Sequence, residues 1–289
     1  MSVESFPYDQ AFSRNLGWVT EEEQQRLKRT RVAIAGLGGV GGVYLLALAR
    51  LGIGRFSIAD FDSFAYANFN RQTGATLSSL DRPKIEVMLA LARDINPELD
   101  VRVFPRGVTT ANRSDFLKDC DVYLDGLDFF ALDIRAQVFA ECSSNGIPAV
   151  TVAPLGMGAA LLNFMPGEMS FEDYFRFGDS SPSEKAMRFL VGLSPAMLQL
   201  SYLVDRSRVD LSSGRGPSTV IAVQLCSGVA AAQVLKIVLR RGEVIAAPRG
   251  LHFDAYRNRL KRTWRPGGNA NPIQRLLLAI AKRRLGHSP

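Results

Sequence analysis

The chain has 289 residues, which suits one large α/β domain or two small ones with a sizeable hydrophobic core. It is 47% hydrophobic and 22% charged, as in an ordinary globular protein, and its formal net charge of +7 is concentrated toward the C-terminus. The first ten residues, MSVESFPYDQ, lack the basic start and apolar core of a secretion signal, and no uninterrupted apolar run is long enough to span a membrane. We therefore expect a cytoplasmic protein without a transmembrane segment.

The first half of the chain alternates between short apolar strands and amphipathic helices. Alternation of this kind predicts an α/β fold with a Rossmann-like, mostly parallel sheet and helices on both faces. The predicted strands lie at 31–36, 55–60, 100–104, 121–125 and 147–153. The predicted helices lie at 40–52, 82–95, 114–118 and 130–144.

The second half is less regular. Its predicted elements are an antiparallel extension at 157–166, a long helix at 218–240 and a closing hairpin at 251–258 and 260–265. Residues 167–216 are rich in Ser, Pro, Gly and charged residues, a composition typical of an irregular crossover or lid segment. We expect one domain over residues 1–265 and a basic C-terminal tail or helix over 266–289.

Cysteine and histidine are sparse. Cys120, Cys142 and Cys226 lie far apart and form no Cys-x-x-Cys pair, which predicts neither a zinc site nor a disulfide framework. Cys226 falls in the apolar helix predicted at 218–240, where burial is the ordinary role of a free cysteine, and Cys142 lies in another predicted helix. His252 and His287 are isolated in the sequence, so a metal site or a catalytic triad built on histidine is not expected.

Residues 36–41, GLGGVG, lie between a predicted strand and a predicted helix. Small residues let the backbone turn tightly there and approach a pyrophosphate, which the helix N-terminus attracts. Asp60 ends the next strand, nineteen residues after the motif, where an acidic side chain binds ribose hydroxyls. This combination predicts a nucleotide site, and the structural alternative is a tight turn without a ligand. The glycines concerned are Gly36, Gly38, Gly39 and Gly41.

Further candidates for the nucleotide site follow Asp60. Lys84 begins the next predicted helix, and Arg71 lies in the preceding loop near the C-terminal edge of the sheet, where open α/β sheets bind ligands. Two cations near the phosphates favour attack on an α-phosphate with loss of pyrophosphate, because negative charge grows there in the transition state. An NAD-dependent oxidoreductase has little need for them. The other candidates in this loop are Asp62, Asn68, Asn70 and Gln72.

A third motif, DVYLDGLD, begins with the strand predicted at 121–125, so Asp128 is expected at the same edge of the sheet. A carboxylate beside a triphosphate most simply binds Mg²⁺, which prefers oxygen ligands and bridges phosphates. Asp125 is a second candidate, or it caps the helix that follows.

In this order, the motifs resemble those of the ThiF/MoeB/HesA family, the bacterial relatives of ubiquitin-activating enzymes. The resemblance runs from Tyr8 to Arg265, nearly the whole chain. It includes an opening segment with Arg14, an acidic strand end followed by an Asn-x-x-Arg-Gln loop, a lysine in DRPKIEVM and an aspartate in DGLDFF. The late helix GPSTVIAVQLCSGVAAAQVLKIVL and the closing strands LHFDAYRNRLKRTWR complete it.

The resemblance implies ATP- and Mg²⁺-dependent adenylylation of a carboxylate, usually the C-terminus of a ubiquitin-like protein, with release of pyrophosphate. The glycine loop would receive the ATP phosphates and Asp60 the ribose. Asn68, Arg71 and Lys84 would hold the triphosphate, and Asp128 would bind Mg²⁺ and favour attack on the α-phosphorus. The resemblance also implies a symmetric homodimer in which Arg14 reaches the phosphates of the neighbouring subunit.

The chain departs from the family pattern in three places. It lacks the paired Cys-x-x-Cys motifs of many relatives, so zinc is not expected. Residues 167–216 contain no cysteine where some relatives bond the activated partner, so we expect the chemistry to stop at the adenylate. Phe129 stands where the family often has Asn, which leaves the carboxylate acceptor open: a small protein, a peptide precursor, a small carboxylate or a carboxylate on modified tRNA.

Two other classes of function remain open at this stage. The glycine loop and Asp60 also fit an NAD-dependent oxidoreductase, although no proton donor is evident, and a nucleotide-binding scaffold without catalysis is a further alternative. The basic C-terminal segment could meet an acidic protein, a nucleic acid, a membrane surface or the partner subunit, or it could be solvated.

Overall fold

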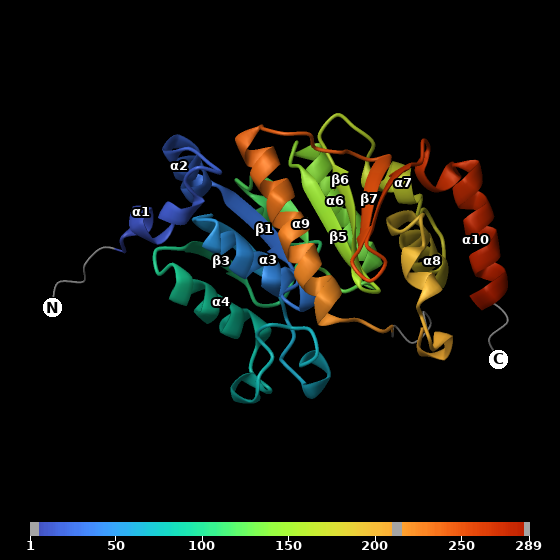
Figure 1. Cartoon of the computed structure of the whole chain (residues 1–289), viewed down its shortest axis with the longest axis horizontal. Coiled ribbons are helices and arrows are strands. Elements are labelled where there is room, and N and C mark those ends of the chain that lie inside the picture. The colour runs from blue at the N-terminus through green and yellow to red at the C-terminus, as the bar shows by residue number, and fades with distance from the viewer. Residues whose placement is uncertain (1–5, 210–215, 286–289) are drawn as a thin grey trace. The chain divides into compact units, whose positions relative to one another are not determined.

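The computed structural model describes residues 6–209 and 216–285, with side chains as far as Arg283 (Figure 1). Contacts divide the chain into two compact units. The first contains Met1–Leu127 and Ala230–Val244, and the second contains Asp128–Val229 and Ile245–Pro289. The single domain expected over residues 1–265 stays a prediction.

The first unit is built on four parallel strands in the order β3-β2-β1-β4. The chain adds β2 and β3 on one side of β1 and then crosses over to add β4 on the other side. Because strand-helix-strand connections are right-handed, α3 and α4 cover one face of the sheet and α5 covers the other. The bounds of the strands are β1 Arg31–Ala35, β2 Arg55–Ala59, β3 Asp100–Phe104 and β4 Val122–Asp125. The helices are α1 Tyr8–Ala11, α2 Glu21–Arg29, α3 Gly39–Arg50, α4 Lys84–Ile95 and α5 Arg113–Leu117.

Buried apolar side chains explain these strands. Every residue of β1 and β4 is buried, as is typical of parallel strands that are covered on both faces. All helices and strands expected in the first half of the chain begin and end within two residues of observed ones. The α/β fold with a parallel sheet and helices on both faces is therefore confirmed.

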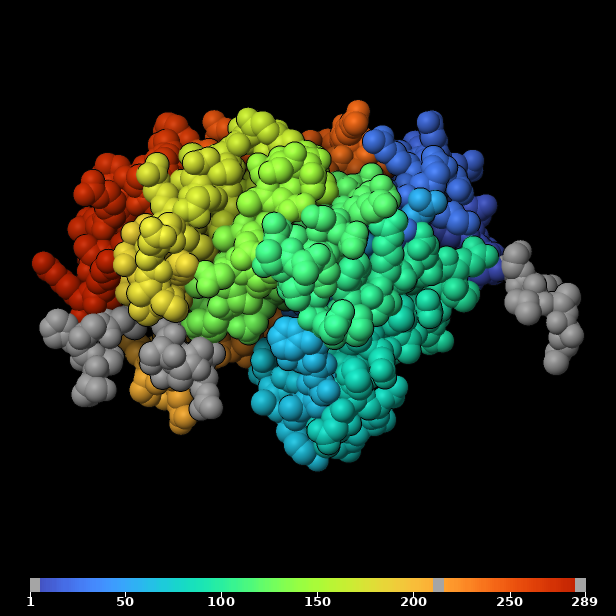
Figure 2. Space-filling model, turned by 180° about the vertical axis from the view of Figure 1, so that it is seen from behind, coloured from blue at the N-terminus to red at the C-terminus, as the bar shows by residue number. Residues whose placement is uncertain are grey.

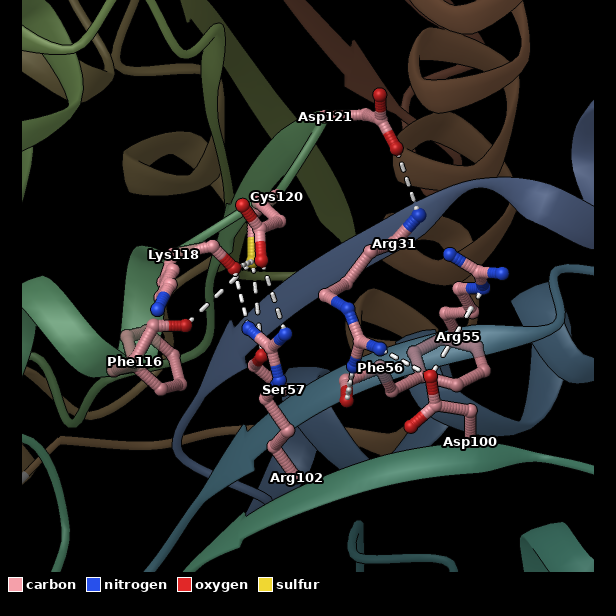
Figure 3. Close-up of polar contacts among 11 residues, drawn as sticks. Arg31, Arg55, Phe56, Ser57, Asp100, Arg102, Phe116, Lys118, Cys120 and Asp121 are labelled. Atoms are coloured by element: carbon pink, nitrogen blue, oxygen red, sulfur yellow. Dashed lines mark hydrogen bonds and ion pairs between the residues drawn. The ribbon is translucent and has the colours of Figure 1, made fainter.

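The amino ends of these strands are joined by polar contacts (Figure 3). The buried Arg31 guanidinium donates to the Phe56 carbonyl at 2.9 Å and pairs with the Asp100 carboxylate, which links β1 to β2 and β3. The Arg31 backbone N–H donates to the Asp121 carboxylate at 2.8 Å, which links β1 to the start of β4. These ends of the strands are thus closed by the protein's own groups.

The second unit contains four antiparallel strands, each paired with the next along the chain. This confirms the antiparallel C-terminal part of the predicted fold. The strands are β5 Ala149–Leu155, β6 Gly158–Phe164, β7 Arg249–Asp254 and β8 Arg259–Trp264. The helices are α6 Leu132–Ser144, α7 Phe171–Phe175, α8 Pro182–Leu193 and α10 Pro272–Leu285.

The expectation of an irregular segment at 167–216 was wrong for its first part, which contains α7 and α8. Ser170 and Ser181 accept hydrogen bonds from backbone N–H groups of the first turns and so cap the two helices. Phe171, Phe175 and Phe189 pack on one another in the core of the unit. Composition suggested a loop because the serines and prolines that begin these helices are also loop residues. Residues 210–215 lie outside the described part of the chain.

Helix α9, Val220–Leu239, contributes its first ten residues to the second unit and the remainder to the first. It has 20 residues and contains an 18-residue window with a mean hydropathy of 1.7, which are enough, by length and composition, to cross a membrane. Gln224, Gln233 and Lys236 interrupt its apolar sequence, and 39% of the apolar window is buried inside the protein. Core helices reach the same length and hydropathy, so these values are weak grounds for a membrane span.

Candidate nucleotide site

The glycine loop connects β1 to α3 at the carboxyl end of the strand. Gly36 has a φ of +83°, and a Cβ there would lie 2.2 Å from the Gly126 carbonyl oxygen. A Cβ on Gly41 would lie 1.7 Å from the Gly36 carbonyl oxygen. Packing of the loop on itself and on the end of β4 therefore explains these two glycines.

Packing does not explain Gly38. The three atoms nearest to a Cβ on Gly38 all belong to the Gln72 side chain, at 3.4 Å or more, which is an ordinary contact. Gly38 is the N-cap of α3 and brings no side chain that could cap the helix. The first N–H groups of a 12-residue helix are thus left without a side-chain cap, which is the arrangement that binds anions.

Asp60 follows β2 and lies against the glycine loop. One carboxylate oxygen accepts from the Leu37 N–H at 2.6 Å, and the other accepts from the Asp62 N–H at 2.8 Å. Burial raises the pKa of Asp60 above its ordinary value, although these two hydrogen bonds and the nearby Lys84 act in the opposite direction. Each carboxylate oxygen can accept a second hydrogen bond, so Asp60 keeps capacity for a ligand hydroxyl.

Lys84 begins α4 and lies close to the end of β2. Its Nζ donates to the Asp62 carboxylate at 3.0 Å, and its backbone N–H donates to the Asp62 carbonyl at 2.8 Å. The Lys84 side chain is 7% exposed, whereas that of Asp62 is 53% exposed. An ammonium carries three donors, so one bond to Asp62 leaves two others that a ligand could accept.

The segment between β2 and α4 protrudes from the first unit (Figure 2, cyan). Asn68 shapes it, because its side-chain oxygen accepts from the Ala65 N–H at 3.0 Å. Arg71 is held in turn by the Ala67 carbonyl and the Asn70 side chain, both 2.8 Å from its Nη1. These contacts occupy one nitrogen of the guanidinium and leave Nε and Nη2 without a partner among the described residues.

Gln72 reaches from this segment back to the glycine loop. It is 7% exposed and packs on Gly38. Its Oε1 is buried and has no hydrogen-bond partner in the described part of the chain. A buried polar atom without a partner is costly, so this oxygen marks a place that is incomplete without water or a ligand.

The remaining predicted site residues are Arg14 and Asp128. Arg14 lies on the short 3-10 helix Ser13–Asn15, where it is exposed. Asp128 is the first residue of the second unit. Its carboxylate accepts from the Phe130 N–H at 3.0 Å, and its carbonyl accepts from Arg135 at 3.0 Å.

Asp125, the alternative to Asp128, ends β4 and is buried. Its carboxylate accepts from the Leu127 N–H at 3.3 Å. Helix α6 begins at Leu132 with Ala131 as its N-cap, so the suggestion that Asp125 caps this helix was wrong. Six residues separate Asp125 from the first residue of this helix, and the sequence pattern did not predict a connection of that length.

Cysteines and possible metal ligands are also present among the described residues. Cys120, Cys142 and Cys226 are all buried, as expected for Cys142 and Cys226, and burial raises the pKa of the Cys120 and Cys226 thiols. Among residues 6–209 and 216–285, no three side chains of the types His, Cys, Asp and Glu come together as a metal site would require.

The second unit contains a buried polar network that was not predicted from the sequence. The Tyr202 hydroxyl donates to the Asp254 carboxylate at 2.6 Å and accepts from the Met157 N–H at 2.8 Å. His252, which is isolated in the sequence, lies 3.1 Å from the Ser194 hydroxyl through its Nδ1, while its buried Nε2 has no partner among the described residues. A polar residue at every second position of an otherwise apolar strand, as in HFD at 252–254, was the available signal.

A surface depression of ≈ 320 Å³ lies along β3, the edge strand of the first unit. Its lining includes Arg102, Asp115 and Lys118 and none of the predicted site residues. Arg102 is engaged with the Lys118 carbonyl at 2.6 Å and with Asp119 at 3.1 Å. The depression therefore offers no competing arrangement of catalytic groups.

Comparison with known proteins gives a family match over most of the chain. The ThiF family model matches residues 12–273. A tRNA threonylcarbamoyladenosine dehydratase from Haemophilus influenzae is 32% identical over 150 residues, which is 52% of this chain and 57% of that protein. The sulfur carrier protein ThiS adenylyltransferase of Escherichia coli is 32% identical over 143 residues, which is 50% of this chain and 56% of that protein. The alignments thus span little more than half of these relatives.

Solved structures share the fold. The crystal structure of Escherichia coli MccB with ATP has a TM-score of 0.64 and 18% identity, covering 88% of this chain and 70% of that chain. At this level of identity the similarity concerns the fold alone.

Proposed function

Because the chain belongs to the ThiF family, we propose that it binds ATP at the glycine loop of the first unit and transfers the adenylyl group to a carboxylate. The observation that carries this proposal is the convergence of four separate sequence motifs at one end of the parallel strands. Asp60 bonds to Leu37 of the glycine loop, Lys84 pairs with Asp62, and Gln72 packs on Gly38. This is the edge at which open α/β sheets bind nucleotides.

The phosphates of ATP would lie at the N-terminus of α3, over Gly38 and Gly39. Backbone N–H groups at a helix N-terminus bind anions, and Gly38 leaves the approach free of a side chain. Arg71 and Lys84 would contact the triphosphate with the donors that the protein does not use. Asn68 and Asn70 hold the loop that presents Arg71, and Asp60 would accept from the ribose.

We assign Mg²⁺ to the triphosphate together with Asp128. Mg²⁺ in nucleotide sites commonly uses one or two carboxylates plus phosphate oxygens, so the lack of a protein-only cluster in the described residues is compatible with it. The ion would offset charge on the phosphates as pyrophosphate leaves.

In the proposed reaction, a carboxylate oxygen of the acceptor attacks the α-phosphorus of ATP. A new P–O bond forms, the bond between the α-phosphorus and the bridging oxygen breaks, and pyrophosphate leaves with its electron pair. Arg71 and Lys84 stabilise the charge that develops on the phosphates. No proton transfer is required when the acceptor is ionised.

The proposed acceptor is the C-terminal carboxylate of a small protein or peptide. The relative named for the sulfur carrier protein ThiS supports this class, while the relative named for a tRNA dehydratase supports a carboxylate on modified tRNA as the second candidate. We further propose a homodimer in which Arg14, exposed and without a partner among the described residues of its own chain, contacts the phosphates bound by the other subunit.

Acceptor-dependent exchange of labelled pyrophosphate into ATP tests the proposal. We expect Mg²⁺-dependent exchange in the wild type and a loss of about 100-fold or more in Arg71→Ala and Asp128→Ala. Arg93→Ala, an exposed arginine on α4, is the matched control and should retain exchange. Full exchange in Arg71→Ala and Asp128→Ala would refute the residue assignment, and tight NADH binding without ATP binding would refute the reaction.

A further inference from the structure

Arg135 is a buried arginine near the beginning of α6, the helix that follows Asp128. It is 2% exposed and is the fourth residue of the helix. Burying a guanidinium is costly unless it is well bonded, and a cation near a helix N-terminus opposes the helix dipole. Neither burial nor helix formation favours an arginine at this position, so the explanation must lie in its contacts.

The contacts of Arg135 hold the backbone of the turn that precedes α6. Its Nη2 donates to the Asp128 carbonyl at 3.0 Å, and its Nη1 donates to the Phe129 carbonyl at 3.3 Å. The guanidinium carbon lies 4.5 Å from the centre of the Phe189 ring, which is a cation–π distance. A planar guanidinium can make these three contacts at once, whereas the compact ammonium of a lysine cannot reproduce them.

The same turn is also packed against α8. Phe189, which is 2% exposed on α8, lies 5.2 Å from the Phe129 ring as well as beneath Arg135. Packing on Phe189 therefore accounts for Phe129, the residue that stands where the ThiF family often has Asn. Two helices of the second unit thus fix the segment that contains Asp128.

This turn leaves part of the Asp128 carboxylate open. One oxygen, Oδ1, accepts from the Phe130 N–H at 3.0 Å, and the Asp128 carbonyl also accepts from the Ala131 N–H at 3.0 Å. The other carboxylate oxygen has no partner among the described residues, and Asp128 is exposed. A carboxylate that is held through one oxygen and open at the other suits Mg²⁺, which binds proteins through one or two carboxylates.

We propose that Arg135 is a positioning residue for the metal: by bonding to the carbonyls of Asp128 and Phe129, it fixes the turn that presents the open carboxylate oxygen of Asp128 to Mg²⁺. The inference rests on the metal role proposed above for Asp128. Groups that orient a metal-binding carboxylate contribute to metal affinity without touching the metal, and their loss commonly weakens that affinity by about 10–100-fold.

Electron paramagnetic resonance of Mn²⁺ with the full chain and a non-hydrolysable ATP analogue tests this inference, since Mn²⁺ accepts the same oxygen ligands as Mg²⁺. We expect Arg135→Lys to weaken Mn²⁺ binding about tenfold and Asp128→Asn to weaken it at least as much. The double variant should have the affinity of Asp128→Asn alone, because Arg135 acts only through Asp128.

Arg31→Lys is the matched control. Arg31 is 4% exposed and also donates to a backbone carbonyl, that of Phe56, at the amino ends of the parallel strands. Its replacement should lower stability, measured by urea unfolding, without changing the affinity for Mn²⁺. A role of Arg135 in stability alone would make the two lysine variants behave alike.

The outcomes separate this inference from the proposed function. Wild-type Mn²⁺ affinity in Arg135→Lys, or additive losses in the double variant, would overturn the inference and leave the role of Asp128 intact. Wild-type affinity in Asp128→Asn would refute the metal role of Asp128 and the inference with it. If Arg135→Lys does not fold, Phe189→Leu removes the ring beneath the guanidinium and should also weaken Mn²⁺ binding; unchanged affinity in that variant would overturn the inference.

Discussion

The first unit concentrates its polar groups at the two ends of four parallel strands, whereas the second unit buries its polar network between β7 and the segment that follows α8. In the second unit Tyr202, Asp254 and the Met157 N–H satisfy one another, whereas the Nε2 of His252 is buried without a partner among the described residues. At the carboxyl ends of the first unit, the Gln72 Oε1 is buried without a partner among the described residues, and Lys84 retains donors.

The closed set of Tyr202, Asp254 and Met157 supports the fold, whereas the groups at the glycine loop that keep donors or acceptors can still bind a ligand. A satisfied network contributes to stability, and its loss leaves a buried group without a partner. An incomplete network contributes to binding, and its loss is measured in affinity and rate. Substitutions in the two units should therefore give different kinds of defect.

The largest contrast is expected between two glycines. Gly41→Ala should lower the free energy of unfolding by at least about 3 kcal/mol, because its Cβ would lie 1.7 Å from the Gly36 carbonyl oxygen and the backbone must shift. Gly228→Ala, in α9, meets nothing within 4 Å and should be neutral or stabilise by up to about 1 kcal/mol. Urea unfolding followed by circular dichroism measures both. Similar stabilities of the two variants would contradict the packing described for the glycine loop.

The next contrast is between two lysines that each pair with an aspartate. Lys84→Met should reduce kcat/KM for pyrophosphate exchange about 100-fold, because a donor to the transition-state charge is lost. Asp62 is 53% exposed and stays solvated without its partner, so the fold should persist. Lys185, paired with Asp133 at 2.7 Å in the second unit, is the control, and Lys185→Met should change the rate less than about twofold. Equal rates in the two variants would remove Lys84 from the site.

The sequence predicted the first unit well because its signals are local. A strand, a glycine turn and a helix follow one another in 31–50, and Asp60 comes at the end of the next strand. The bond between Asp60 and Leu37 follows from that order. The contacts of the second unit were not predictable in this way, since Tyr202 and Asp254 are 52 residues apart and Ser194 and His252 are 58 apart. No periodic pattern connects such positions, and only the folded chain shows that they meet.

A smaller effect is expected from the buried carboxylate of the second unit. Asp254→Asn should cost about 1–3 kcal/mol of stability, because Tyr202 and the Arg257 N–H donate to different oxygens of Asp254 and one of these becomes an NH2 group, which cannot accept. Its ATP affinity should equal that of the wild type. Asp119→Asn, whose carboxylate is 67% exposed, serves as the control and should cost less than about 1 kcal/mol. A loss of ATP binding in Asp254→Asn at unchanged stability would show that this network belongs to the ligand site.

The smallest effect concerns pH. Burial lowers the pKa of His252 below its ordinary value of 6.5, although Asp254 acts in the opposite direction. The neutral ring is therefore favoured in the folded state, and its contribution to stability is present above pH 6.5 and is lost as the pH falls through the folded-state pKa. Relative to His252→Asn, the wild type should lose at most about 1.4 kcal/mol per pH unit between pH 6.5 and the folded-state pKa. If the difference in free energy of unfolding between the two proteins stays the same from about pH 7.5 to about pH 5, this assignment is contradicted.

The central claim is that the first unit holds a triphosphate between the glycine loop and the cations of the β2–α4 segment. A structure of the full chain with Mg²⁺ and a non-hydrolysable ATP analogue tests it most directly. We predict that nitrogens of Arg71 and Lys84 lie within hydrogen-bond distance of phosphate oxygens and that the Asp60 carboxylate contacts the ribose. A nucleotide bound with these three side chains turned away from it would contradict the account.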